Sequence, residues 1–332
     1  MPGGDAGGDA GAPDGDAAYD VVVVGGGLAG LTAGLLAARY GHRTLVLEST
    51  APGGHLINVE QIEDFPGFPE GVAGYDLCPL VQEQAERHGA HFRLAEAEGL
   101  EPLGPAGAGW RLLTTEGAVH AGAVIVASGS RPKPLGVPGE AALEGRGISH
   151  CATCDGPLFK GKVVGVAGGS DWALPEALTL TGFASRVILL DARPEGAAFA
   201  GQETFRRRLE AQPAIEVRPR VAVQEVLGDG VLQGVRLRDA ASGEESVLPL
   251  AGLFVYAGLE PNTAFLGDRL RLTSDGRIPT DARMRTELPG VFAAGDVRQD
   301  AAGHAVTAAG DGGTAAVAAH RYLADRSSSA VR

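Results

Sequence analysis

A run of four valines, Val21–Val24, opens the first clear pattern of hydrophobic residues in the chain. Consecutive β-branched residues without polar alternation are typical of a strand that is buried on both faces of a parallel sheet. The glycine-rich residues 25–30 then predict a turn, Leu31–Tyr40 predicts a helix, and Thr44–Leu47 predicts a second strand. This order predicts a βαβ unit that ends at Glu48.

The same order recurs in the middle of the chain. We expect a strand at Lys162–Ala167, a turn at 168–173, a helix at Leu174–Phe183 and a strand at Arg186–Leu190, which leads into Asp191. In both units the acidic residue follows the first glycine of the turn by 23 positions. The repeated plan predicts an α/β fold with two Rossmann-like dinucleotide-binding domains. Further strands are expected at Ala123–Val126, Leu253–Ala257 and Val291–Ala294, and a closing helix at Gly312–Leu323.

Length and composition narrow the class of protein. The 332 residues suffice for two domains, and a hydrophobic content of 44% is that of a globular chain despite 51 glycines and 20 prolines. The net charge of -13 leaves no basic stripe, which argues against a nucleic-acid partner. Residues 1–18 contain only Met, Pro, Gly, Asp and Ala, and this composition predicts a disordered leader.

The apolar segment at residues 21–38 resembles a membrane span because it carries no charge over 18 positions. The glycine triplet after the valines instead predicts a strand, a turn and a helix. No basic residue precedes the segment, so we do not expect a signal peptide. Three cysteines are too few for the disulfide framework of a secreted protein, and we therefore expect a cytoplasmic protein with no membrane partner.

Gly25, Gly27 and Gly30 follow the G-x-G-x-x-G pattern between the first strand and the first helix. In a dinucleotide site the first glycine turns the chain, the second lets the backbone approach a pyrophosphate, and the third lets the helix pack closely on the strand. The helix N-terminus favours phosphate charge, and Glu48 can bind a ribose diol. An ordinary tight turn is the alternative, but strand, helix and acid together favour dinucleotide binding.

The second glycine turn departs from this pattern. Ser170 stands where close approach to a pyrophosphate needs glycine, and Trp172 brings an indole to the start of the helix. Asp191 stands at the ribose position, where it repels a 2′-phosphate, so a working site is expected to prefer NADH to NADPH. The alternative is a vestigial site in which Trp172 only packs.

Cys151 and Cys154 form a Cys-x-x-Cys motif that is followed directly by Asp155. Two cysteines at this spacing can close a small disulfide and exchange electrons with a flavin and a substrate disulfide, with the acid available for proton transfer. A structural zinc site needs a second ligand pair, which the sequence lacks, so no metal is expected. Cys78 is expected to be a buried core thiol. His150 can lower the pKa of a neighbouring thiol or stand apart from it, and its role stays open.

Six motifs in order along the chain carry a family resemblance. They are Gly25–Gly30, Gly53-Gly54, Phe65–Pro69, Cys151–Gly156, Gly295–Val297 and Thr307–Gly312. Together they resemble the low-molecular-weight thioredoxin reductases over residues 19–325. The resemblance implies a homodimeric flavoprotein in which residues 19–134 and 265–332 form an FAD-binding domain. Residues 135–264 would then be an inserted nicotinamide-type domain that carries the redox cysteines.

The resemblance also implies roles for individual residues. FAD is expected at Gly25, Gly27, Gly30, Glu48, Gly54, Asn58, Gly129, Gly295, Asp296, His304 and Ala305. Cys154 is expected to face the flavin, Cys151 to attack the substrate, and Asp155 to relay protons.

Three departures from the family pattern affect nicotinamide use or the surroundings of the flavin. The glycine motif of the nicotinamide domain is altered at Ser170 and Trp172. The basic cluster for the 2′-phosphate falls on Asp191, Ala192, Arg193 and Ala197, of which only Arg193 is basic. An Arg-Gln pair near the flavin falls on Gly303-His304.

The leading hypothesis is an FAD-dependent disulfide reductase that acts on thioredoxin or a similar small redox protein. Its electron donor is expected not to be NADPH, and ferredoxin is a candidate. One alternative is a dithiol oxidase that closes a disulfide in a small metabolite with oxygen as acceptor. Others are an ordinary NAD(P)H-dependent thioredoxin reductase and a redox-sensing flavoprotein that binds a partner without turnover.

Overall fold

The computed structural model of the chain describes residues 18–104, 108–193 and 202–330. Residues 329 and 330 are described by their backbone alone. The chain forms two compact units. The first comprises the chain up to Ile57, Gln61–Gly129 and the chain from Pro261 onward, and the second comprises Asn58–Glu60 and Ser130–Glu260. This confirms an α/β fold with two Rossmann-like units, the second inserted in the first.

The boundaries of these units differ by a few residues from the domain boundaries expected after residues 134 and 264. The assignment of FAD and nicotinamide to the two domains stays a prediction. The expected leader lies outside the described residues except for Ala18, which opens the first strand.

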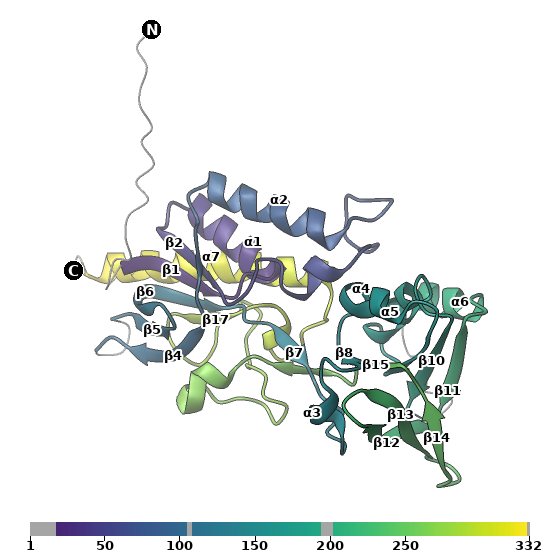
Figure 1. Ribbon diagram of the computed structural model, residues 1–332. Helices are drawn as coiled ribbons and strands as arrows, with labels where there is room; N and C mark the ends of the chain where they lie inside the picture. The colour runs from purple at the N-terminus through teal and green to yellow at the C-terminus, as the bar shows by residue number, and fades with distance from the viewer. Residues whose placement is uncertain (1–17, 105–107, 194–201, 331–332) are drawn as a thin grey trace. The chain divides into compact units, whose positions relative to one another are not determined.

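The first unit is built on a seven-stranded sheet (Figure 1). Its parallel strands are β1 (Ala18–Val24), β2 (Thr44–Glu48), β3 (His91–Leu94), β6 (Gly117–Val126) and β17 (Val291–Ala293). The antiparallel strands β5 (Trp110–Thr114) and β4 (Ala97–Pro102) extend it beyond β6. The valines of β1 are 0–5% exposed and pair with β2 on one side and β6 on the other, which explains their uninterrupted apolar run.

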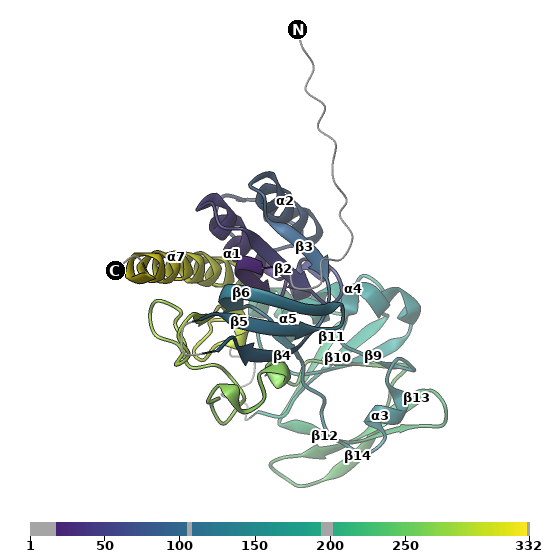
Figure 2. The same cartoon turned by 90° about the vertical axis from the view of Figure 1, so that its left-hand side faces the viewer.

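Among its described residues, the first unit has the helices α1 (Leu28–Arg39), α2 (Gly74–Arg87) and α7 (Ala305–Ala330). Figure 2 shows α7 foreshortened, running up to α1. Ala29, Ala33 and Ala37 of α1 share a core cluster with Ala315 and Ala319 of α7, so small side chains let the two helices approach closely. Within the described ranges, no helix combines the length and the apolar character that crossing a membrane requires.

The second unit contains a five-stranded parallel sheet in the order β11-β10-β9-β15-β8. These strands are β8 (Ile148–Ser149), β9 (Val163–Ala167), β10 (Arg186–Asp191), β11 (Ile215–Pro219) and β15 (Gly252–Val255). Its helices are α3 (Glu140–Leu143), α4 (Ala152–Asp155), α5 (Ala173–Leu180) and α6 (Glu203–Glu210). An antiparallel sheet of β12 (Val221–Gly228), β13 (Leu232–Asp239) and β14 (Glu245–Pro249) packs in the same core.

Short elements complete the chain. The strands β7 (Ser130–Pro132) and β16 (Leu259–Pro261) pair with each other. Single 3-10 turns are η1 (Gly54–Asn58), η2 (Gly156–Phe159), η3 (Ala264–Arg269) and η4 (Gly295–Val297).

Every expected strand and helix is present, but several ends differ. The first helix begins at Leu28, so Gly30 lies in its first turn rather than in the loop. The last helix begins at Ala305, seven residues before Gly312, because the motif at 307–312 is itself helical. The helix of the second unit ends at Leu180 and not at Phe183, and β15 ends at Val255 and not at Ala257.

Candidate functional site

The first glycine turn contains two glycines that the fold itself requires. Gly25 has φ +104°, and a Cβ there would lie 2.3 Å from the Ala127 carbonyl oxygen. A Cβ at Gly30 would lie 1.8 Å from the carbonyl oxygen of Gly25. Both positions therefore exclude any side chain, because the backbone that follows β6 or the backbone of the turn occupies the space.

Gly27 differs, because the described part of the chain gives no packing reason for glycine there. Its φ of -67° suits any residue, and no described atom lies within 4 Å of a Cβ built on it. Gly27 is also the N-cap of α1, so the amides of the residues that follow it are the first N–H groups of the helix. An open approach to a helix N-terminus fits the pyrophosphate of a dinucleotide such as FAD, whose negative charge these groups stabilise.

Glu48 stands at the end of β2 with its carboxylate held against the glycine turn. Its Oε2 accepts a hydrogen bond from the Gly26 amide at 2.7 Å, and its Oε1 accepts one from the Thr50 amide at 3.0 Å. These bonds fix the acid beside the turn that precedes α1, in the position where a ribose-binding acid is expected.

A second glycine loop lies against the first. The Gly53 amide donates to the Gly26 carbonyl at 2.8 Å, and a Cβ at Gly54 would lie 3.3 Å from the Gly27 Cα. Gly129 lies three residues after the end of β6 and has φ +62°, and no described atom lies within 4 Å of its Cβ position. The structure thus brings Gly54 to the predicted turn, whereas Asn58 ends η1 and is grouped with the second unit.

An ion pair holds the Gly295-Asp296 loop to α7. Asp311 accepts hydrogen bonds from Arg298, at 2.5 Å from Nε and 3.1 Å from Nη2, and from the Gly295 amide at 3.2 Å. Asp311 is only 8% exposed, so both of its oxygens are satisfied inside the unit. The sequence motifs included Asp311 but gave no sign of Arg298, whose partner is 13 residues away.

Asp296 brings a partly buried carboxyl to this loop. Burial raises its pKa, an effect that Arg277, His55 and His304 oppose and that Asp311 reinforces. The Arg277 guanidinium also donates to the Asp296 carbonyl oxygen. Such a carboxyl is a suitable acceptor for cofactor hydroxyls, because the bonds would replace the water it loses on burial.

His304 and Ala305 lie at the start of α7. His304 Nδ1 is 2.9 Å from Asp64 Oδ2, and Ala305 is the first residue of the helix and is buried. The position that departs from the family's Arg-Gln pair is therefore bound to an acid of the segment between η1 and α2.

Cys151 and Cys154 are joined in a disulfide at the start of α4. Cys151 is the N-cap of this helix, and its Sγ accepts a hydrogen bond from the Cys154 amide at 3.1 Å. Cys154 is exposed and Cys151 is partly buried. This arrangement can support thiol–disulfide exchange, because helix N–H groups stabilise a thiolate at the N-cap. Cys78, as expected, is fully buried, and burial raises the pKa of its thiol to about 11.

Asp155 closes the same short helix. Its Oδ2 accepts a hydrogen bond from Ser149 Oγ at 2.6 Å, and Ser149 Oγ in turn accepts one from the Cys151 amide at 3.1 Å. The two ring nitrogens of His150 face the Val255 carbonyl at 3.1 Å and Glu144 at 3.3 Å. Asp155 is therefore connected to the cysteine turn through Ser149, while His150 is engaged with other partners.

Comparison with known proteins agrees with this geometry. The pyridine nucleotide-disulphide oxidoreductase family model matches residues 19–312. A thioredoxin reductase of Mycolicibacterium smegmatis is 38% identical over 93% of this chain and 97% of its own length. One from Streptomyces coelicolor is 40% identical over 92% of this chain and 94% of its own length. The crystal structure of Lactococcus lactis thioredoxin reductase in the FR conformation superposes with a TM-score of 0.88 at 34% identity, covering 92% of this chain and 99% of that chain.

The chain belongs to the pyridine nucleotide-disulphide oxidoreductase family. Within it, the chain belongs with the low-molecular-weight thioredoxin reductases, which confirms the resemblance carried by the six motifs. It is a flavin-dependent disulfide oxidoreductase, and its cofactor is FAD.

The second glycine turn of this oxidoreductase is occupied by the side chains of its own unit. Arg193 donates to Asp191 from Nε at 3.0 Å and from Nη2 at 2.8 Å, and its Nη2 also donates to the Gly169 carbonyl at 2.5 Å. Asp171 accepts a hydrogen bond from the Gln202 amide at 2.5 Å. Trp172 packs edge to face on Tyr256 with ring centroids 5.0 Å apart. Ala197, part of the expected departure from the basic cluster, lies outside the described residues.

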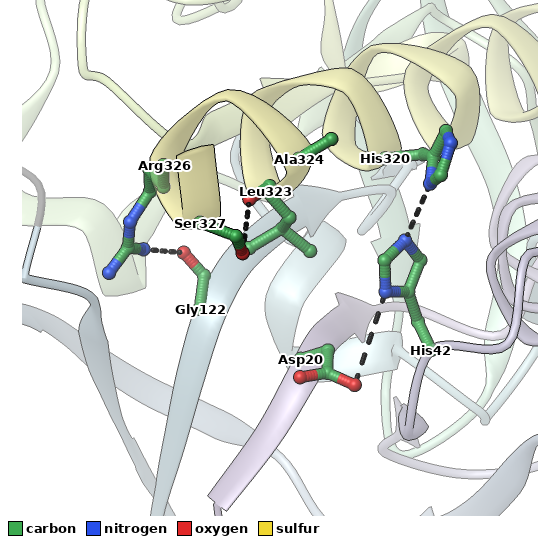
Figure 3. Close-up of a pocket in the computed structure, with 8 residues that line it drawn as sticks. All are labelled: Asp20, His42, Gly122, His320, Leu323, Ala324, Arg326 and Ser327. Atoms are coloured by element: carbon green, nitrogen blue, oxygen red, sulfur yellow. Dashed lines mark hydrogen bonds and ion pairs between the residues drawn. The ribbon is translucent and has the colours of Figure 1, made fainter. Parts of the chain in front are cut away.

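One cavity of the oxidoreductase shares no residue with the predicted site (Figure 3). It has a volume of about 610 Å³ and is lined by Asp20, His42, Gly122, His320, Leu323, Ala324, Arg326 and Ser327. His42 and His320 point toward each other, with Nε2 and Nδ1 3.0 Å apart. Burial lowers the pKa of His42, and the sequence gave no signal for this pair because its members are 278 positions apart.

Proposed function

We propose that the chain is a reductase of thioredoxin or a similar small redox protein, with an electron donor other than NADPH. The observation that carries the donor part of the proposal is the engagement of Arg193 by Asp191 and the Gly169 carbonyl. Arg193 is the single basic residue left at the 2′-phosphate position. Its bonds to Asp191 raise the pKa of its guanidinium, and its charge is already compensated.

An NADPH site at this turn would need two things that these residues oppose. The backbone would have to approach the pyrophosphate where Ser170 now stands. Positive charge would have to face the 2′-phosphate, where Asp191, with a side chain 3% exposed, already holds Arg193. Loss of two charge-assisted phosphate contacts, at about 1.5–3 kcal/mol each, weakens binding by two or more orders of magnitude.

The first unit is proposed to hold FAD. The residues that would bind it are Gly25, Gly27 and Gly30 of the first turn, Glu48 at the end of β2, and Gly54, Gly129, Gly295, Asp296, His304 and Ala305. Asn58, which is also expected to bind FAD, is grouped with the second unit. Once reduced by the electron donor, the bound flavin would supply the two electrons that open the Cys151–Cys154 disulfide and would return to its oxidised form. A homodimer and a cytoplasmic location are part of the same proposal.

The chain's own residues then carry out the exchange. Cys154 receives the electrons from the flavin side, and Cys151 attacks the disulfide of the substrate from the N-cap of α4. The resulting mixed disulfide is resolved by Cys154, which restores the disulfide. Asp155 accepts and returns the protons of the two thiols, supported by its hydrogen bond from Ser149. The thioredoxin part of the proposal is supported by relatives that are named thioredoxin reductases.

An anaerobic titration of the oxidised holoprotein tests the donor. NADPH, NADH and reduced ferredoxin are added separately while the flavin absorbance is recorded. We expect slow bleaching at best by NADPH, with NADH no slower. Rapid bleaching by micromolar NADPH refutes the donor part of the proposal and supports an ordinary thioredoxin reductase. Turnover with small dithiols and oxygen, without any of these donors, supports a dithiol oxidase instead.

A matched pair of variants tests the role of the Arg193 contact. Asp191→Ser frees Arg193 and removes the repelling charge, so bleaching by NADPH is expected to become faster. Asp229→Ser removes a carboxylate from an exposed turn of the same unit and is expected to leave the rate unchanged. Equal rates in Asp191→Ser and the parent, with folding intact by thermal denaturation, show that the contact does not limit NADPH use.

A further inference from the structure

A buried carboxylate and a tyrosine lie behind the disulfide, outside the roles assigned above. Glu176 of α5 and Tyr256, directly after β15, are joined by a hydrogen bond of 2.7 Å from the Tyr256 hydroxyl to Glu176 Oε2. The Ala152 amide donates to both of them, at 3.0 Å to Glu176 Oε2 and at 3.1 Å to the Tyr256 oxygen. Ala152 is the residue between the two cysteines that follows Cys151, and it is fully buried.

The Ala152 amide, which is the first N–H group of α4, is bound to Glu176 and Tyr256 and not to the sulfur of Cys151. In a Cys-x-x-Cys helix the N-cap thiolate is stabilised by the N–H groups of the first turn. Here the Cys154 amide points at Cys151 Sγ, but the Ala152 amide points at a carboxylate. Because α4 has only four residues, its helix dipole does little to offset the negative charge that Glu176 brings to the start of the helix.

We propose that Glu176, braced by Tyr256, is a positioning residue of the Cys151–Cys154 centre that holds the Ala152 amide and whose negative charge disfavours the Cys151 thiolate. The proposal rests on the proposed function in taking Cys151 as the attacking thiol. It favours one direction of electron flow at this centre, from the cysteine pair to the substrate disulfide. A destabilised thiolate makes the reduced pair a stronger electron donor, which suits reduction of a substrate disulfide, whereas oxidising Cys-x-x-Cys proteins stabilise their thiolate.

The groups around Glu176 act on its pKa in opposite directions, and its hydrogen bonds are those of an ionised carboxylate. Burial raises the pKa of Glu176, the hydrogen bonds from Tyr256 and Ala152 oppose this, and the charge of Glu60 adds to it. Burial and the charge of Glu176 raise the pKa of Tyr256, to which Asp155 also contributes, so Tyr256 stays protonated and donates. Two donors converge on Glu176 Oε2, as expected for an ionised carboxylate.

Glu176→Gln separates charge from position. A glutamine oxygen can still accept from the Ala152 amide and the Tyr256 hydroxyl, so the turn stays in place while the negative charge is lost. The full-length holoprotein carrying Cys154→Ser serves as the parent, so that Cys151 is a free thiol. Glu210→Gln, at an exposed position of α6, is the matched control for loss of one carboxylate in the same unit.

The measurement is the rate of alkylation of Cys151 by iodoacetamide as a function of pH, followed by mass spectrometry of the Cys151 peptide. Peptide mapping separates Cys151 from Cys78. The midpoint of the rate profile is expected to fall by about one pH unit in Glu176→Gln, the usual effect of removing one nearby like charge. Glu210→Gln is expected to match the parent. A Glu176→Gln midpoint equal to or above that of the parent overturns the proposal.

Tyr256→Phe provides a second test if the first variant folds poorly. The change removes the hydroxyl that donates to Glu176 and offsets its negative charge, so the midpoint is expected to stay at or rise above that of the parent. A Tyr256→Phe midpoint clearly below that of the parent contradicts the proposal. Alkylation requires neither an electron donor nor thioredoxin, so these results stand apart from any failure of the proposed function.

Discussion

At Gly27 the proposed requirement for glycine comes from the cofactor and not from the fold. Because its φ is -67° and no described atom lies within 4 Å of its Cβ position, Gly27→Ala is expected to leave the fold of the apoprotein intact. The added methyl group stands where the pyrophosphate of FAD must approach the start of α1. The variant is therefore expected to fold normally and to bind FAD weakly.

The magnitudes follow from the same geometry. Alanine is a poorer N-cap than glycine by about 0.5–1 kcal/mol. It also restricts the unfolded chain, which stabilises the fold by about 0.4–1 kcal/mol, so the two effects nearly cancel. On the cofactor side, loss of one charge-assisted phosphate contact costs about 1.5–3 kcal/mol, which corresponds to one to two orders of magnitude in the dissociation constant of FAD.

Two glycine variants serve as controls. A Cβ at Gly30 would lie 1.8 Å from the Gly25 carbonyl oxygen, so Gly30→Ala is expected to destabilise the apoprotein itself by about 1–3 kcal/mol or more. Gly182 is exposed, and the nearest atom to its Cβ position is 3.4 Å away, so Gly182→Ala is expected to change neither stability nor FAD binding.

The assay combines urea unfolding of the apoprotein with fluorescence titration of FAD. We expect the Gly27→Ala apoprotein to have the free energy of unfolding of the parent and to bind FAD more weakly. Parental FAD affinity in this variant would refute the assignment of Gly27 to the pyrophosphate. A loss of apoprotein stability as large as that of Gly30→Ala would refute the argument from open space.

Three further results are expected. Cys154→Ser, reduced and mixed with oxidised thioredoxin, should accumulate a mixed disulfide on a non-reducing gel and Cys151→Ser should not; the reverse pattern would exchange the roles of the two cysteines. Asp296→Asn should stabilise the apoprotein by about 1 kcal/mol at neutral pH. Because burial raises the pKa of Asp296, its ionisation destabilises the folded state as pH rises above the ordinary carboxyl range, so the gain should vanish in acid; urea unfolding across pH checks this, and a gain independent of pH contradicts it. Arg298→Met should cost about 3 kcal/mol in urea unfolding because it leaves Asp311 unpaired, and Asp311→Asn added to it should recover part of the loss; no recovery would mean that the charge is not the cause.

The elements that the sequence predicts best are those with a strong local signal. Val21–Val24 have to be a buried strand because no polar residue interrupts them, and the glycines that follow can only turn the chain. The antiparallel strand β12 lacked such a signal, since its residues alternate irregularly between buried and exposed and a bulge interrupts its pairing. The sequence predicts the start of α7 too late, because glycines are typical of turns and yet a glycine-containing motif forms the first turns of this helix.

The candidate site follows the same division. Glycine turns and a Cys-x-x-Cys motif are contiguous in the sequence and could be identified there. The contacts that support them are not contiguous, because Glu176 and Tyr256 are 80 positions apart and Arg298 reaches Asp311 only through the packing of α7. The sequence allows Trp172 either to crowd a working nucleotide site or to pack in a vestigial one, and the structure shows its ring packed edge to face on Tyr256.

The central claim is that electrons leave the flavoprotein through Cys151 and Cys154 to a thioredoxin-like disulfide, and one donor-independent measurement tests it. The holoprotein is reduced anaerobically with dithionite, freed of excess reductant and mixed with oxidised thioredoxin, and the thiols on the separated thioredoxin are counted. Our account predicts that the parent protein converts thioredoxin to the dithiol and that Cys151→Ser, loaded with FAD to the same extent, does not. An unreduced thioredoxin with the parent protein, or equal reduction by the variant, would contradict it.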